Sequence, residues 1–153
     1  MTVKDLQTSD VKSCGRDTDL ATVAKMMWEG DCGAVPVVSE DHKVIGMITD
    51  RDICIAAATR AKTPAELHAR DVITGNGVHA VRPDDDVRVA LRTMRKHRVR
   101  RLPVVDQQQR LSGILSINDL AINTSSNVAG SVPAQEFLET LQAICAHERK
   151  TAA

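Results

Sequence analysis

The stretch Gly46-Met47-Ile48-Thr49-Asp50-Arg51-Asp52 returns 67 positions later as Gly113-Ile114-Leu115-Ser116-Ile117-Asn118-Asp119. Each copy has a glycine, two hydrophobic residues, a hydroxyl side chain, two variable residues and an aspartate. The same shift, without any insertion, places Pro36 on Pro103. Self-similarity at a fixed spacing indicates that one supersecondary unit is present twice, so the chain is predicted to contain two structural repeats.

Each repeat is predicted to run strand, helix, strand, strand, helix. In the first repeat, hydrophobic residues recur at helical spacing over 20–28, with Asp17 or Thr18 available as the N-cap and Gly30 as the stop. Two β-branched runs around a polar turn then predict a hairpin, and a second helix follows. The expected elements of this repeat are a helix over 20–28, strands over 34–38 and 43–49, and a helix from Asp50.

The second repeat has the same pattern. Its expected elements are a helix over 87–94, strands over 101–105 and 110–116, and a helix from Ile117. Between the repeats, Thr63-Pro64-Ala65-Glu66 predicts a short helix with a capping box and a proline at its first position.

A single repeat is too small to cover its own sheet well, so we expect the two repeats to fold together as one module. The predicted fold class is α+β. The predicted boundaries are 1–62 for the first repeat, 63–125 for the second, and 131–150 for a C-terminal amphipathic helix.

The C-terminal helix has a hydrophobic face with two possible uses. This face carries Phe137, Leu138, Leu141, Ile144 and Cys145. It can pack onto its own module, or it can form a dimer contact.

The repeated motif places a hydroxyl and an acid at a predicted helix start. Thr49 with Asp52, and Ser116 with Asp119, have the spacing of a capping box, which satisfies the free amides there. The same geometry offers a phosphate the amides, a hydroxyl and the positive end of the helix, while the carboxylate can accept two hydrogen bonds from a ribose diol. These residues alone leave both interpretations open.

Both copies resemble the CBS domain family, whose hallmark is Gly-h-h-Thr/Ser-x-x-Asp, with h for hydrophobic, after a strand with a central proline. Those strands are Ala-Val-Pro-Val-Val over 34–38 and Arg-Leu-Pro-Val-Val over 101–105. The resemblance covers residues 3–122 and implies a stand-alone pair of CBS domains with pseudo-twofold symmetry and two clefts. It further implies an adenosyl ligand (AMP, ADP or ATP, in some members NAD or S-adenosylmethionine) and a homodimer.

The resemblance also assigns roles to individual residues. The expected ligand-binding residues are Asp52 and Asp119 for ribose hydroxyls, Thr49, Ser116, Arg51, Arg100 and Arg101 for phosphate, and the backbone around Ala34, Val35 and Leu102 for adenine. Arg101 has Ala34 as its counterpart in the first repeat, so the two clefts need not be equivalent.

The composition is that of an ordinary globular protein, with 20 basic and 20 acidic side chains. The N-terminus has no apolar leader and no apolar run is long enough to span a bilayer, so we expect a cytoplasmic protein with no membrane contact. The four cysteines lack CxxC spacing, and we expect no metal site and no required cofactor. No nucleophile and base are placed together in the sequence, so we expect no enzyme.

Two other functions stay open beside that of a regulatory adenine-nucleotide sensor acting on an unknown effector protein. A structural dimerisation module with vestigial clefts would keep the capping boxes without a ligand. A nucleic-acid-binding protein would use the basic cluster from Arg88 to Arg101. The last is the least expected, because aromatic residues form only 1% of the chain and offer no stacking platform.

Overall fold

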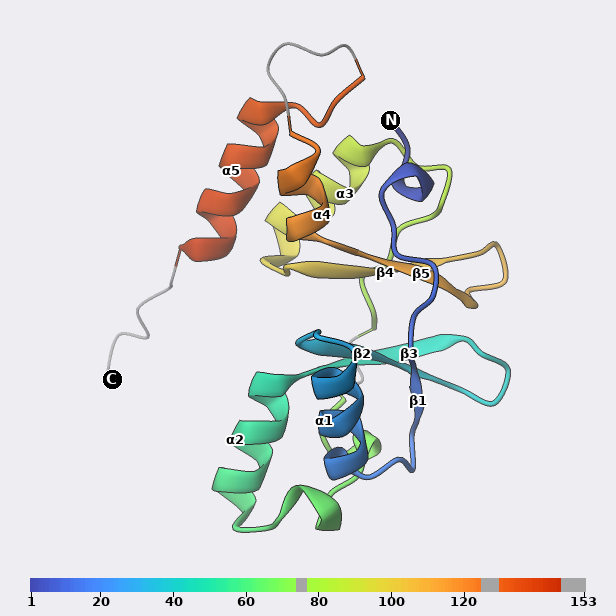
Figure 1. The fold of residues 1–153 in the computed structure, drawn as a ribbon, viewed down its shortest axis with the longest axis vertical. Coiled ribbons are helices and arrows are strands. Elements are labelled where there is room, and N and C mark those ends of the chain that lie inside the picture. The colour runs from blue at the N-terminus through green and yellow to red at the C-terminus, as the bar shows by residue number, and fades with distance from the viewer. Residues whose placement is uncertain (74–76, 125–129, 147–153) are drawn as a thin grey trace. The chain divides into compact units, whose positions relative to one another are not determined.

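The computed structural model describes residues 1–73, 77–124 and 130–146. The chain forms two compact units, drawn in Figure 1. Unit 1 holds residues 1–9, 79–104 and the chain from 112 onward, and unit 2 holds residues 10–78 and 105–111. No helix in the described ranges is long and apolar enough to cross a membrane.

Unit 2 contains the helices and strands of the first repeat. Its elements are β1 (Cys14–Gly15), α1 (Leu20–Glu29), β2 (Ala34–Val38), β3 (Val44–Thr49) and α2 (Asp50–Arg60). The central strand β2 runs parallel to β1 and antiparallel to β3. All five residues of β2 are buried, which explains its unbroken apolar sequence. Its Val35 and Val37 join Leu20 and Met27 of α1 and Ile53 of α2 in one hydrophobic core.

Unit 1 contains the helices of the second repeat and the C-terminal helix. Its elements are α3 (Val87–His97), β4 (Arg101–Val105), β5 (Leu111–Ser116), α4 (Ile117–Ile122) and α5 (Ala134–Cys145), with residues 105–111 of the β4–β5 hairpin counted in unit 2. A parallel bridge joins Val81 to Val104, and it is the counterpart of the β1–β2 pair Cys14 and Val37. The predicted order of elements is therefore confirmed in both repeats, as is the α+β class. The first strand is only two residues long in one repeat and a single bridge in the other.

The caps of the first helix differ in part from the prediction. Asp19, not Asp17 or Thr18, is the N-cap of α1, because its carboxylate accepts from the amide of Thr22 at 2.9 Å. Asp17 instead forms an ion pair with Arg70, and the Thr18 hydroxyl accepts from Gly15. Gly30 ends the helix as predicted.

The predicted turn between the repeats is a single turn of 3-10 helix, η2 (Pro64–Glu66). The amide of Thr63 donates to the Glu66 carboxylate at 2.8 Å, so the predicted capping contact forms.

The segment that opens each repeat packs in the unit that holds the helices of the other repeat. In unit 1, the turn η1 (Val3–Asp5) buries Val3 completely, and Thr8 pairs with Ile114 of β5. In unit 2, the turn η3 (Ala69–Asp71) buries Ala69 completely. Sequence analysis did not predict this exchange.

This exchange explains the glycine of the repeated motif. A Cβ atom on Gly46 would lie 2.6 Å from the side chain of Ile73. A Cβ atom on Gly113 would lie 2.8 Å from the carbonyl oxygen of Thr8 and 2.9 Å from the side chain of Gln7. Only glycine therefore lets the opening segment lie directly on the strand.

The C-terminal helix α5 packs on α3 and α4 of unit 1. Its predicted span was 131–150, of which 147–150 lie outside the described residues. Phe137 and Ile144 pack against the core, and Thr140 between them is buried. The Thr140 hydroxyl donates to the carbonyl of Glu136 at 2.8 Å, so its hydrogen bond is satisfied without water. The other three residues of the predicted apolar face are exposed: Leu138, Leu141 and Cys145. Packing onto the helix's own unit is thus confirmed, and the dimer contact stays a prediction.

Candidate ligand-binding site

The motif residues lie where a strand ends and a helix begins. In unit 2, Thr49 is the last residue of β3 and pairs with Ala34 of β2. The amide of Asp50 donates to the carbonyl of Gly33 at 3.2 Å. In unit 1, the amide of Ile117 donates in the same way to the carbonyl of Arg100, at 2.8 Å. The start of the hairpin is therefore held beside the helix start in both units.

The hydroxyl and the carboxylate of the motif form a complete capping box. In unit 2, Oδ2 of Asp52 accepts from the amide and the hydroxyl of Thr49, each at 2.8 Å, and the amide of Asp52 donates to Oγ1 of Thr49 at 3.2 Å. In unit 1, Oδ2 of Asp119 accepts from the amide of Ser116 at 2.7 Å and from its hydroxyl at 2.6 Å, and the Asp119 amide donates to Oγ at 3.3 Å. Oδ2 of each aspartate therefore caps the helix start, as the capping interpretation predicts.

The capping box leaves one carboxylate oxygen unused. Within the described residues, Oδ1 of Asp52 and Oδ1 of Asp119 accept no hydrogen bond, and both side chains are only partly buried. An ionised carboxylate has acceptor sites on both oxygens, so one oxygen can cap the helix while the other accepts from a ligand hydroxyl. Helix capping and ribose binding are thus compatible at the same residue.

The hydroxyl groups of the motif already donate their protons within the capping box. Thr49 and Ser116 each donate their hydroxyl proton to the neighbouring aspartate. A hydroxyl has one proton to donate, so a phosphate oxygen can take it only if this bond to the aspartate is broken. The predicted phosphate role is therefore weaker for the hydroxyls than for the arginines.

The residues expected near adenine have buried side chains. Ala34, Val35 and Leu102 are at most 4% exposed, and their side chains belong to the strands β2 and β4. The side chains are therefore not available to a ligand, and the contact of their backbone with adenine stays a prediction.

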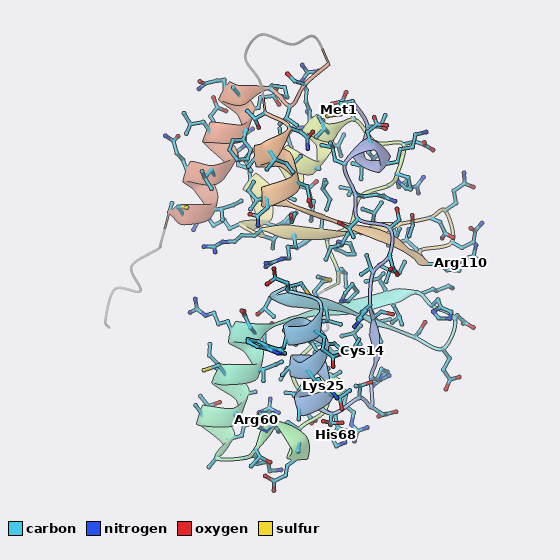
Figure 2. All side chains as sticks on the ribbon, in the orientation of Figure 1. Met1, Cys14, Lys25, Arg60, His68 and Arg110 are labelled. Atoms are coloured by element: carbon cyan, nitrogen blue, oxygen red, sulfur yellow. The ribbon has the colours of Figure 1, made fainter. Side chains whose placement is uncertain are left out.

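The three arginines expected near phosphate have no carboxylate partner among the described residues. Arg51 and Arg100 are exposed, and Arg101 is partly buried. Ion pairs of other arginines include Arg70 with Asp17, Arg88 with Glu136, Arg95 with Glu139, and Arg110 with Asp106. Arg110 is labelled in the β4–β5 turn in Figure 2. Arg51, Arg100 and Arg101 therefore remain available to an anion.

The basic cluster of the second repeat is partly neutralised by α5. Arg88 lies 3.1 Å from Glu136, and Arg95 lies 2.7 Å from Glu139. Two guanidinium groups that a nucleic acid would need are thus engaged within unit 1, which weakens the nucleic-acid interpretation.

The cysteines and the described histidines were compared with the requirements of a metal site. No group of three or more His, Cys, Asp or Glu side chains among the residues with described positions is placed to hold an ion. Cys14, labelled in Figure 2, lies in the core of unit 2, and burial raises the pKa of its thiol to about 11. Cys32, Cys54 and Cys145 are exposed.

Sequence reasoning missed two residues that lie against the motif. Gln7 lies on Gly113 and Ile73 lies on Gly46. The signal was the repeated glycine itself, which marks a place where another segment approaches the backbone closely.

The fold and the twin motif define a protein built from a duplicated unit of one strand, a helix, two strands and a helix. Residues 3–58 and 67–123 match the model of the CBS domain, so the chain belongs to the CBS domain family. The resemblance drawn from the repeated motif is thereby confirmed.

Individual relatives cover most of the chain. The CBS domain-containing protein YhcV of Bacillus subtilis is 35% identical over 129 residues, which is 82% of this chain and 86% of that protein. The crystal structure of Hypoxic Response Protein I with two coordinated zinc ions has a TM-score of 0.73 and 30% identity, and the match covers 82% of this chain and 100% of that one. The CBS domain pair of protein MJ0100, in complex with 5′-methylthioadenosine and S-adenosyl-L-methionine, has a TM-score of 0.71 and 27% identity over 80% of this chain and 94% of that one.

Proposed function

We propose that this chain is a regulatory module that binds an adenine nucleotide or a related adenosyl ligand. The observation that carries the proposal is the free Oδ1 atom of Asp52 and of Asp119, held in the same place in both repeats by a complete capping box. A carboxylate oxygen fixed in this way is preorganised to accept hydrogen bonds from ribose hydroxyls.

The relatives support the same class of ligand. The domain pair of MJ0100 is described in complex with 5′-methylthioadenosine and S-adenosyl-L-methionine, and both molecules contain adenosine. The candidate ligands for this chain are AMP, ADP, ATP, NAD and S-adenosylmethionine. Their shared adenosine is the part that the two aspartates and the backbone of β2 and β4 would hold.

The two sites should differ in their preference for phosphate. Arg101 in unit 1 has Ala34 as its counterpart in unit 2, whereas Arg51 in unit 2 has Asn118 as its counterpart in unit 1. Arg101 follows Arg100, whose carbonyl accepts from the amide of Ile117 at the start of α4, so the backbone of this arginine pair lies beside the strand end that carries Ser116. We expect the unit 1 site to prefer a ligand with phosphate next to ribose.

The module would act through an effector protein rather than through catalysis. We further propose that the protein is cytoplasmic and that it forms a homodimer. The exposed Leu138 and Leu141 of α5 offer an apolar surface for the dimer contact. Ligand binding would then change the conformation or the partner contacts of the dimer.

The test is titration of AMP and adenosine, by calorimetry, into the wild type and three variants. We expect Asp52→Asn and Asp119→Asn to weaken both ligands at the affected site by roughly 1.5–3 kcal/mol, which is tenfold or more. Arg101→Ala should weaken AMP more than adenosine, because adenosine has no phosphate.

A matched control uses carboxylates that cap other helices. Asp19 caps α1 and Asp86 caps α3 through their side chains, and neither lies in the motif. Asp19→Asn and Asp86→Asn should leave ligand affinity unchanged.

The vestigial interpretation is the second candidate, because the capping box is complete without a ligand. It predicts that none of the five candidate ligands, at millimolar concentration, raises the melting temperature of the wild type. A ligand that binds only the folded state must raise it.

A further inference from the structure

The loop that leads into the hairpin has the same backbone in both units. Asp31 in unit 2 and Arg98 in unit 1 are 67 positions apart, and both have a left-handed backbone, with φ of 46° and 52°. In each loop the following amide donates to the carbonyl five residues earlier, at 3.0 Å in unit 2 and 3.1 Å in unit 1. Two residues after Asp31 and Arg98, the carbonyls of Gly33 and Arg100 accept from the start of the motif helix. The two loops therefore hold equivalent residues beside equivalent motifs.

The charges at these equivalent positions are opposite in the two units. The loop and motif of unit 2, 31–34 and 49–52, carry three acidic residues and one basic residue. Those of unit 1, 98–101 and 116–119, carry three basic residues and one acidic residue. All of these side chains are exposed or partly buried. The unit 2 charge set is Asp31, Asp50, Arg51 and Asp52, and the unit 1 charge set is Arg98, Arg100, Arg101 and Asp119.

The acidic residues of unit 2 are close enough to the motif to act on a bound ligand. Asp50 directly follows Thr49, and its amide donates to the carbonyl of Gly33. Asp31 is two residues before Gly33, and consecutive Cα atoms are about 3.8 Å apart, so the Cα atoms of Asp31 and Gly33 lie within roughly 7.6 Å of each other. The screening length in physiological salt is about 8 Å. Both carboxylates therefore favour a cation at this motif and disfavour an anion.

The candidate adenosyl ligands differ in charge at the 5′ carbon of the ribose. AMP carries a phosphate there, with a charge of about −1.5 to −2 at neutral pH. S-adenosylmethionine carries a positively charged sulfonium on the same carbon, and adenosine carries a neutral hydroxyl. The motif carboxylate would hold the shared ribose in either unit, so the surrounding charges decide between these three ligands.

We propose that the two sites of this chain select adenosyl ligands of opposite charge. The unit 1 site takes an anionic adenine nucleotide, and the unit 2 site takes an adenosyl compound with a positively charged 5′ group. Asp31 and Asp50 determine the choice in unit 2, where Arg51 is the only basic residue of the charge set. This inference rests on the proposed function and adds that the module responds to two different ligands at once.

The experiment is calorimetric titration of AMP, adenosine and S-adenosylmethionine into the full chain. When AMP already fills its tighter site, one equivalent of S-adenosylmethionine should still bind to the wild type. In the double variant Asp31→Asn/Asp50→Asn, S-adenosylmethionine should bind at least about tenfold more weakly and AMP should bind its weaker site more tightly. Adenosine, which is neutral, should bind as it does to the wild type. Asparagine tolerates the left-handed backbone of Asp31, so this variant should fold.

A matched control removes the same number of charges from the other end of the hairpin. Glu40 and Asp41 are exposed in the turn after β2. They lie beyond Val38, which is about 13 Å along the strand from Ala34 and so farther than the screening length. Glu40→Gln/Asp41→Asn should leave all three affinities unchanged. In 1 M salt the screening length falls to about 3 Å, so the preference of unit 2 for S-adenosylmethionine over adenosine should largely disappear.

Three results would overturn the inference while adenosine binding still supported the proposed function. The first is competition of AMP and S-adenosylmethionine for one site. The second is an unchanged affinity for S-adenosylmethionine in Asp31→Asn/Asp50→Asn, and the third is an equal loss in the control variant. If all three ligands fail to bind, adenosine included, the proposed function is wrong together with this inference.

Discussion

Gln7 has a buried amide oxygen that lacks a hydrogen-bond donor among the described residues. Its Nε2 atom makes two long bonds, to the Ser9 hydroxyl at 3.3 Å and to the Ser112 carbonyl at 3.4 Å. The opposite orientation of the amide would place its oxygen against the Ser112 carbonyl, so the orphaned atom is the oxygen. In the other unit the equivalent place on the motif glycine is taken by Ile73, which has no polar atom.

We therefore predict that Gln7→Met stabilises the protein. Methionine keeps the length of the side chain and removes an unsatisfied acceptor, which should add about 1 kcal/mol to the free energy of unfolding. The reverse change, Ile73→Gln, should cost roughly 1–3 kcal/mol because it places an amide in the apolar position. Urea denaturation measures the free energy of unfolding of both variants. A loss of stability in Gln7→Met would show that the two long bonds outweigh the orphaned oxygen.

The last residue of α3 stacks on a histidine that precedes the helix in the chain. His97, the final residue of the helix, stacks on His79 with ring centroids 3.4 Å apart and an angle of 16° between the rings. Burial, the neighbouring His79 and Lys96 together lower the pKa of His97 below its ordinary value of 6.5. The folded state thus favours the neutral imidazole more than the unfolded chain does.

The lowered pKa of His97 makes the stability of the folded protein depend on pH. As the pH falls through about 6.5, the unfolded chain takes up a proton on His97 before the folded protein does, so the folded protein loses stability. We predict that the melting temperature of the wild type falls between pH 7.5 and pH 5.5, and that it falls less in His97→Gln. The control is His42→Asn, since His42 is exposed and has a φ of 59°, a conformation that asparagine tolerates. Equal pH slopes in the wild type and His97→Gln would contradict the prediction.

Each unit depends on a segment from the other repeat. The N-terminal arm, residues 1–9, supplies Val3 to the core of unit 1, and its backbone bonds to Asp85 and Ile114. Val3 is fully buried. Among the described residues, the hydrophobic core of unit 2 includes no residue of this arm.

We predict that Val3→Ala destabilises unit 1 selectively, by about 2 kcal/mol, because it removes two buried carbon atoms and leaves a cavity. Hydrogen exchange measured by mass spectrometry should become faster in peptides from α3 and β5 and stay unchanged in those from α1 and β2. The control Lys4→Ala changes an exposed residue of the same arm and should have little effect. Equal acceleration in both units would show that they unfold as one body.

Much of the candidate site was predictable because its geometry is local. Thr49 and Asp52 are three residues apart, as are Ser116 and Asp119, and a helix start brings such residues together wherever it forms. The fact that Oδ1 stays free could not be predicted, because it depends on what else surrounds the carboxylate. The predicted N-cap of α1 was wrong for a similar reason. Asp17, Thr18 and Asp19 have side chains that can all cap a helix, and the choice of Asp19 depends on where the chain turns.

The amino-acid sequence by itself determined the repeat, the order of helices and strands, the α+β class and the family, since hydrophobic periodicity and capping motifs act over a few residues. Only the tertiary structure decided which unit the opening segments join, why Gly46 and Gly113 must be glycine, and how α5 divides its apolar residues between the core and solvent. Arg88 and Glu136 are 48 residues apart, and Thr8 and Ile114 are farther still. Contacts of this kind depend on how distant segments compete for the same surface, and no local pattern records the outcome of that competition.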